Sequence, residues 1–128
     1  MSHARLFAYL FGAIYLVVGI VGLVSPGGLG MNTTHLIGLF PVNIIHNLVH
    51  LGVGGIGLAL GATGVAASRF YARLLAVVYG LVAVLGFAPQ PFLSILPLGS
   101  LDIVLHTATA VIALYIGFLM PQEAGKRA

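Results

Sequence analysis

The chain has 128 residues, of which 60% are hydrophobic and 5% are charged, and it has no cysteine. A soluble domain carries about 25% charged residues, so this composition excludes a soluble protein and predicts contact with the lipid bilayer. The lack of cysteine excludes disulfides and thiolate metal sites. A net charge of +3 from five Lys and Arg residues is too sparse for a nucleic-acid-binding face.

Four apolar runs approach the roughly 20 residues that cross a bilayer core. A signal peptide is the alternative for the first run, but an internal repeat, described below, gives that run a structural counterpart. We therefore predict an all-α, four-helix transmembrane bundle that forms a single domain over residues 1–128. The expected spans are at about 6–24, 42–62, 70–87 and 101–120.

The basic residues predict the orientation of these spans. All five lie on one side of a four-span arrangement: Arg5, Arg69, Arg73, Lys126 and Arg127. The two long connections on the other side contain no Lys, Arg, Asp or Glu. Because basic residues accumulate on the cytoplasmic side of a membrane, both termini are expected in the cytoplasm.

The two halves of the chain repeat a pattern. The segment from Ala4 to Ala8 matches the segment from Ala72 to Ala76, with an arginine second in each. Further on, the set Pro41, His46 and His50 matches the set Pro97, Asp102 and His106 at the same spacing. This predicts two parallel helical-hairpin repeats, in which spans two and four are equivalent.

The polar residues of spans two and four share a face with small residues. Residues four apart lie on one side of a helix, so His46 aligns with His50 and Asp102 aligns with His106. Small residues continue both faces and mark close helix packing; they are Gly54, Gly57, Gly61, Ala113 and Gly117. The polar groups are therefore expected to point at protein and not at lipid.

Three imidazoles and one carboxylate without sulfur suit a divalent metal, zinc or copper. The predicted ligands are His46, His50, Asp102 and His106. Asn43 and Asn47 are expected to orient the histidine rings through the ring nitrogens that do not bind the metal. The predicted function is binding of this ion on the outer side, in a structural or sensory role.

Other interpretations stay open at this point. The cluster could be a hydrogen-bonded clasp between helices in an accessory subunit of a larger membrane complex or in a homo-oligomer. Two histidines could ligate a haem or a pigment, and intramembrane His and Asp can relay protons, although nothing polar continues down spans two and four. No general base beyond Asp102 is available, so a non-enzymatic role is favoured.

The run from Leu39 to Gly57, with its Phe-Pro-Val-Asn-x-x-His-Asn-x-x-His core, resembles a family of small bacterial four-span membrane proteins classed as a domain of unknown function. The stretch Leu96-Pro97 with Asp102-x-x-x-His106 is similar to that family's second motif. The resemblance extends from about Arg5 to Gly117. It implies a bacterial inner-membrane protein with four helices, and it implies no activity.

Overall fold

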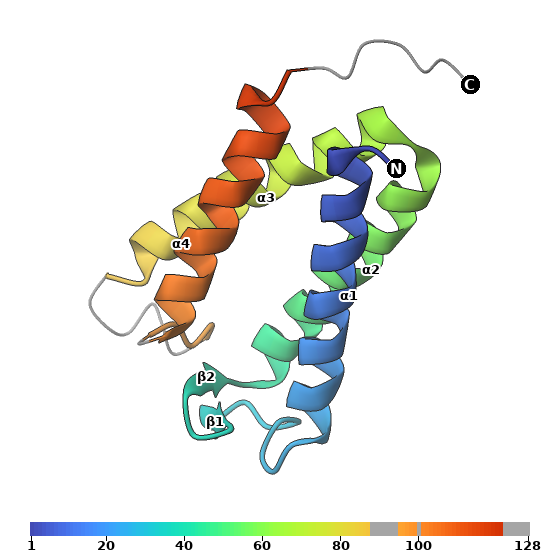
Figure 1. The fold of residues 1–128 in the computed structure, drawn as a ribbon. Helices are drawn as coiled ribbons and strands as arrows, with labels where there is room; N and C mark the ends of the chain where they lie inside the picture. The colour runs from blue at the N-terminus through green and yellow to red at the C-terminus, as the bar shows by residue number, and fades with distance from the viewer. Residues whose placement is uncertain (88–94, 100, 122–128) are drawn as a thin grey trace.

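The fold is known from a computed structural model, which describes residues 1–87, 95–99 and 101–121 (Figure 1). Its helices are α1 (His3–Val24), α2 (Ile44–Thr63), α3 (Val65–Leu85) and α4 (Leu101–Leu114), and α4 continues as the π-helical turn η2 (Tyr115–Leu119). Each of α1, α2, α3 and the α4–η2 helix is long and apolar enough to cross a membrane. The predicted four-helix membrane architecture is confirmed, and the chain is a small multi-pass membrane protein.

The largest difference from the expected helix boundaries is at the start of α3. Helix α3 begins at Val65 rather than near Phe70, because α2 and α3 are joined by the single residue Gly64. The backbone of Gly64 has φ 146° and ψ −175°, a conformation that a residue with a side chain rarely adopts. Arg69 therefore lies within the second turn of a helix rather than in a loop.

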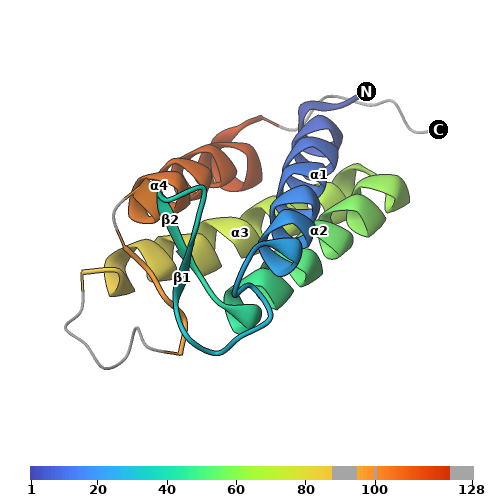
Figure 2. The ribbon, with the colours of Figure 1, turned by 90° about the horizontal axis from the view of Figure 1, so that it is seen from below.

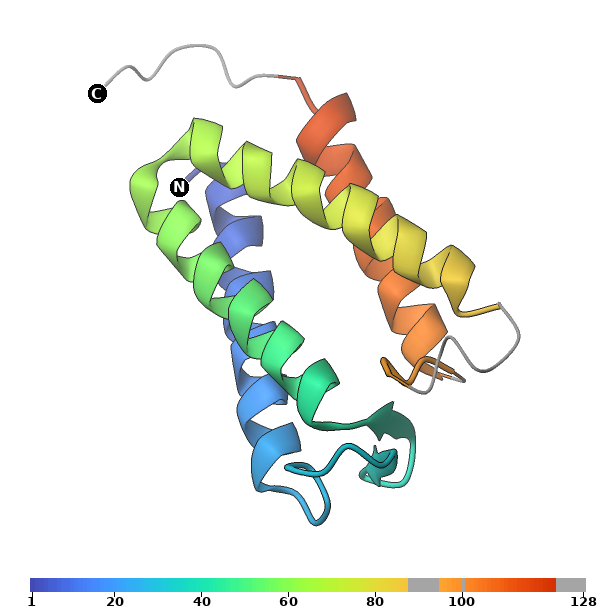
Figure 3. The same cartoon turned by 180° about the vertical axis from the view of Figure 1, so that it is seen from behind.

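The four helices form two pairs. Helix α1 packs along α2, and α3 packs along α4, while the pairs contact each other through α1, α2, α3 and η2. Figures 1 and 3 show that the pairs meet at the end that holds the N-terminus and the α2–α3 connection, and diverge toward the opposite end. The buried apolar core joins three of the four helices: Phe7, Ala8, Tyr15, Tyr71, Ala72, Leu75, Ala76, Tyr79 and Ala113.

A β-hairpin lies across the end where the helix pairs diverge (Figure 2). Strands β1 (Thr34–Leu36) and β2 (Phe40–Val42) pair antiparallel with His35 opposite Pro41, and β2 contacts both α2 and α4. The sequence pattern did not predict strands in this connection. The hairpin bridges the two helix pairs and defines what we call the hairpin end of the molecule.

Glycines allow α1 and α2 to approach at backbone distance. A Cβ atom added to Gly54 would lie 2.4 Å from the backbone nitrogen of Leu16, and one added to Gly12 would lie 2.8 Å from that of Leu58. A Cβ atom added to Gly57 would lie 2.9 Å from the Cα atom of Gly12 and 2.6 Å from the Tyr71 side chain. The small-residue face of α2 therefore packs against protein, as expected for close membrane-helix contacts.

The remaining small residues also face neighbouring helices. A Cβ atom on Gly61 would lie 3.3 Å from the ring of Tyr9. On the second pair, Ala113 has no exposed surface, and a Cβ atom on Gly117 would lie 2.9 Å from the backbone nitrogen of Arg73.

We expect Gly54→Ala to separate α1 from α2 and to lower the free energy of unfolding by about 1–3 kcal/mol, the usual cost of overpacking. The matched control is Gly55→Ala on the same helix, where an added Cβ atom meets nothing within 4 Å. Unfolding in detergent, monitored by far-ultraviolet circular dichroism, measures the stability of both variants. Equal stability of the two variants would contradict the close contact.

The internal repeat is visible in a pair of arginine contacts. Arg5 Nε donates to the carbonyl of Gly61 at 3.0 Å, and Arg73 Nε donates to the carbonyl of Gly117 at 2.8 Å. Arg69 donates in the same way to the carbonyl of Met120. The last carbonyls of a helix have no intrahelical partner, so these arginines stabilise the ends of α2 and of the α4–η2 helix at the same end of the molecule.

Candidate metal centre

Helices α2 and α4 bring His46, His50 and His106 together at the hairpin end. One ligand atom from each of the three lies within 4.8 Å of the others. The ring centroids are 4.5 Å apart for His46 and His50, 6.0 Å for His46 and His106, and 6.4 Å for His50 and His106. The residues are only 2%, 5% and 4% exposed, respectively. The N-terminal turns of α2 and α4 therefore bring their histidines together at one buried position.

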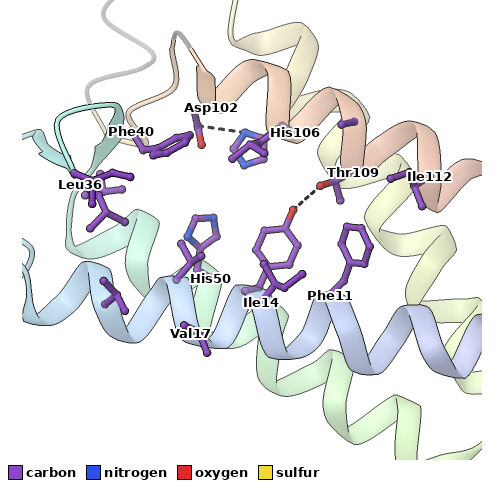
Figure 4. Close-up of a pocket in the computed structure, with 17 residues that line it drawn as sticks. Phe11, Ile14, Val17, Leu36, Phe40, His50, Asp102, His106, Thr109 and Ile112 are labelled. Atoms are coloured by element: carbon purple, nitrogen blue, oxygen red, sulfur yellow. Dashed lines mark hydrogen bonds and ion pairs between the residues drawn. The ribbon is translucent and has the colours of Figure 1, made fainter.

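Asp102 lies beside this group and contacts only one of its rings. Its Oδ2 atom is 3.3 Å from His106 Nδ1, one helical turn further along α4 (Figure 4). That is an ion-pair distance without hydrogen-bond geometry, and neither atom forms a hydrogen bond with any other described residue. Asp102 is itself buried, so its carboxylate faces His106 from within the protein.

The ring of His46 is oriented by the backbone of its own motif. Its Nδ1 atom lies 3.0 Å from the carbonyl oxygen of Pro41. A carbonyl oxygen only accepts hydrogen bonds, so the contact with Pro41 requires the proton on Nδ1. This tautomer leaves the lone pair on Nε2, the atom that can bind a metal.

The two asparagines bind backbone groups near the site. Asn43 caps α2 by accepting from the backbone N–H of His46 at 2.9 Å, and its amide donates to the carbonyls of Ile95 at 2.9 Å and Met31 at 3.4 Å. Asn47 donates to the carbonyl of Gly28 at 3.0 Å. Their contacts hold the connections against α2, and a role in orienting histidine rings stays a prediction.

Two tyrosine rings form an aromatic side of the site that the sequence motifs did not indicate. The Tyr15 ring lies 5.3 Å from that of His50, and the Tyr79 ring lies 4.8 Å from that of His106. The Tyr15 hydroxyl also forms a 2.9 Å hydrogen bond with Thr109 Oγ1, which joins α1 to α4. The available signal was position: membrane tyrosines favour the interfaces, whereas Tyr15 and Tyr79 lie in the interior of α1 and α3.

The donor set fits a metal ion better than a haem. His50 Nδ1, His106 Nδ1 and Asp102 Oδ2 are buried and have no hydrogen-bond partner among the described residues. A buried polar group without a partner costs about 1–3 kcal/mol, and a cation would satisfy such a cluster. A haem between His50 and His106 would need a planar slot, but His46 lies against both of their rings.

Comparison with known proteins gives one match. No curated protein and no solved structure matches the chain. The sequence profile of one family matches residues 5–119, a segment that contains all of the four helices except the first two residues of α1, and every residue of the candidate site. This confirms the resemblance noted in the sequence. The chain belongs to the family described as Domain of unknown function (DUF4383).

Proposed function

We propose that the protein binds one divalent metal ion, zinc or copper, through His46, His50 and His106, in a structural or sensory role. The observation that carries the proposal is the convergence of three buried imidazoles from two membrane helices, with ligand atoms within 4.8 Å of one another. Imidazole ligands without sulfur suit zinc and copper(II). Placing ionisable side chains inside a membrane protein costs free energy unless they have partners, and such side chains usually mark functional sites.

The geometry requires a small closure around the ion. Zinc–nitrogen bonds of about 2.0–2.1 Å in a tetrahedral site place ligand atoms about 3.4 Å apart, so the rings would move together by about 1 Å. Three histidines leave a fourth coordination position. We predicted Asp102 as that ligand, but its contact with His106 favours a supporting role, in which a carboxylate orients a metal-binding imidazole.

We infer that the site lies on the outer side of a bacterial inner membrane. Arg5, Arg69 and Arg73 lie at the end opposite the hairpin, where they contact the ends of α2 and η2, whereas Lys126 and Arg127 lie outside the described residues. Basic residues favour the cytoplasmic side. This rule supports cytoplasmic termini. We also propose that the whole chain forms one membrane domain.

Metal analysis of the purified protein tests the proposal. The chain is purified in detergent without chelator and without a polyhistidine tag, and is then quantified by elemental mass spectrometry. We expect about one ion per chain, as in a mononuclear site, and loss of the ion in His50→Ala and His106→Ala. His35→Ala is the matched control, because His35 is an exposed hairpin residue.

The same experiment separates the competing function. If the wild-type protein binds neither zinc nor copper after reconstitution, the metal function is wrong. The cluster is then a clasp within an accessory subunit, which predicts co-purification of a larger membrane partner and unchanged metal content in the histidine variants. The hydrogen bond between Tyr15 and Thr109, which joins α1 to α4 beside the histidines, is the observation that favours this second candidate.

A further inference from the structure

A cavity of about 510 Å³ lies between α1 and α4 at the hairpin end (Figure 4). Over the described residues α1 and α4 do not pack along each other, although the hydrogen bond between Tyr15 and Thr109 spans the gap. Cavities of 300–1,000 Å³ are typical of small-molecule sites. The space exists because each of these two helices packs on a different partner.

The cavity opens toward lipid. Its rim consists of apolar side chains that are about half exposed, and these lie within two membrane spans: Ile14, Val17, Leu105 and Ile112. Exposed apolar residues in a membrane span face acyl chains. A ligand therefore enters sideways from the membrane and needs an apolar body.

The hairpin closes one end of the cavity. Leu36, Ile37 and Phe40 contribute side chains to its wall. Ile37 is 75% exposed and has φ 49°, a backbone conformation that is uncommon for a β-branched residue. Strain of this kind is often retained at ligand-binding sites, and here it places an apolar side chain at the edge of the cavity.

The polar end of the cavity favours a neutral head group. Asp102, His50 and His106 line it, all three more than nine-tenths buried, and His50 Nδ1 has no hydrogen-bond partner among the described residues. The described lining includes no Lys or Arg to balance an anionic head group, and Asp102 would repel one. A head group that exchanges hydrogen bonds without a charge fits these residues.

Aromatic rings define the shape of that head group. Tyr15 and Phe40 line the cavity together with the imidazole of His50, and Figure 4 shows Phe40 at the end that holds Asp102 and His106, with Phe11 nearer the other end. Flat rings stack favourably on aromatic side chains. The wall thus selects a planar ring at the polar end and a hydrocarbon tail toward lipid.

We propose that this cavity binds a membrane-soluble amphiphile with a neutral, planar, oxygen-bearing head group and a hydrocarbon tail, the chemistry of a quinone or quinol. The proposal goes beyond metal binding and does not depend on it. The head group exchanges hydrogen bonds with His50 and the residues around it, and the tail lies between α1 and α4.

Photolabelling tests this assignment. The full chain in phosphatidylcholine nanodiscs, where acyl chains compete throughout, is labelled with an azidoquinone that carries a ten-carbon tail. We expect saturable labelling of one site per chain on peptides of α1 and α4, and displacement by decylubiquinone but not by oleic acid. Non-saturable labelling, or stronger displacement by oleic acid, would overturn the proposal.

Variants connect the labelling to the cavity. Ala108→Phe and Leu105→Trp add bulk to lining residues, and each should weaken labelling at least about 10-fold, since binding depends on free space in the pocket. Val111→Phe is the matched control, because Val111 is exposed on α4 and is not a lining residue. Circular dichroism selects the folded variants, and equal labelling of a filled variant and the control would refute the assignment.

The metal and the amphiphile are tested separately. His46 belongs to the candidate metal centre but does not line the cavity. We expect His46→Ala and chelator-treated wild-type protein to retain quinone labelling even where metal is lost. Loss of labelling in both would contradict the metal-independent site, whereas retained labelling in a protein that never binds metal would support the cavity and remove only the metal function.

Discussion

Replacing His46, His50 or His106 singly by alanine is expected to lower the affinity for zinc or copper by at least about 100-fold, because each would supply one of the three imidazole ligands of the proposed site. The three side chains are buried and converge within 4.8 Å, so no exposed histidine substitutes for a lost ligand. Competition with a chromophoric chelator measures the affinity of each folded variant. Near-wild-type affinity in any one variant would remove that residue from the site.

Asp102→Asn separates a ligand from a supporting residue. If Asp102 orients His106 through the 3.3 Å contact, the amide variant should bind metal about 10- to 100-fold more weakly, the usual effect of losing an outer-shell partner. If Asp102 is the fourth ligand, Asp102→Asn should lower the metal affinity as much as a histidine variant does. The same competition assay decides between these roles, and an unchanged affinity would exclude both.

Asn43→Ala is expected to lower the free energy of unfolding by about 2–4 kcal/mol, combining a lost helix cap with unpaired backbone groups. Asn43 is completely buried. It caps α2 at the backbone N–H of His46 and donates to the carbonyls of Ile95 and Met31. One side chain thus connects α2 to the segments that precede α4 and β1.

Two further variants show whether the loss of stability comes from the contacts of Asn43. Asn43→Ser keeps a capping oxygen but removes both amide donations, so its stability should lie between those of the wild type and Asn43→Ala. Asn32→Ala, at an exposed position in the same connection, should change stability by less than about 0.5 kcal/mol. Denaturation in a detergent series measures the stability of all three variants. Equal stability of Asn43→Ala and Asn32→Ala would rule out the structural role of Asn43.

Most of the fold could be predicted because its signals are local. Each span is a continuous apolar run, and lipid requires such a run to be helical, so four helices follow from four runs. The boundary of α3 was placed five residues late, since Arg69 resembled a loop residue. In the structure its guanidinium reaches the carbonyl of Met120, and a long basic side chain near a helix end can extend to the interface.

The candidate site was only partly predictable. The i, i+4 spacing places His46 with His50 and Asp102 with His106 on shared helix faces, and the repeat relates the two pairs. The spacing does not tell which groups converge across helices. The structure gathers three imidazoles and leaves Asp102 beside one of them.

The sequence by itself determined the membrane class, the four helices and the polar faces of α2 and α4, because these depend on composition and on the helical period. Only the tertiary structure decided the divergence of the helix pairs, the hairpin that bridges them and the cavity beside the histidines. These features depend on how closely each helix approaches its neighbours, which is set by contacts such as Gly12 with Gly54. Such contacts join residues far apart in the chain, and no local pattern specifies them.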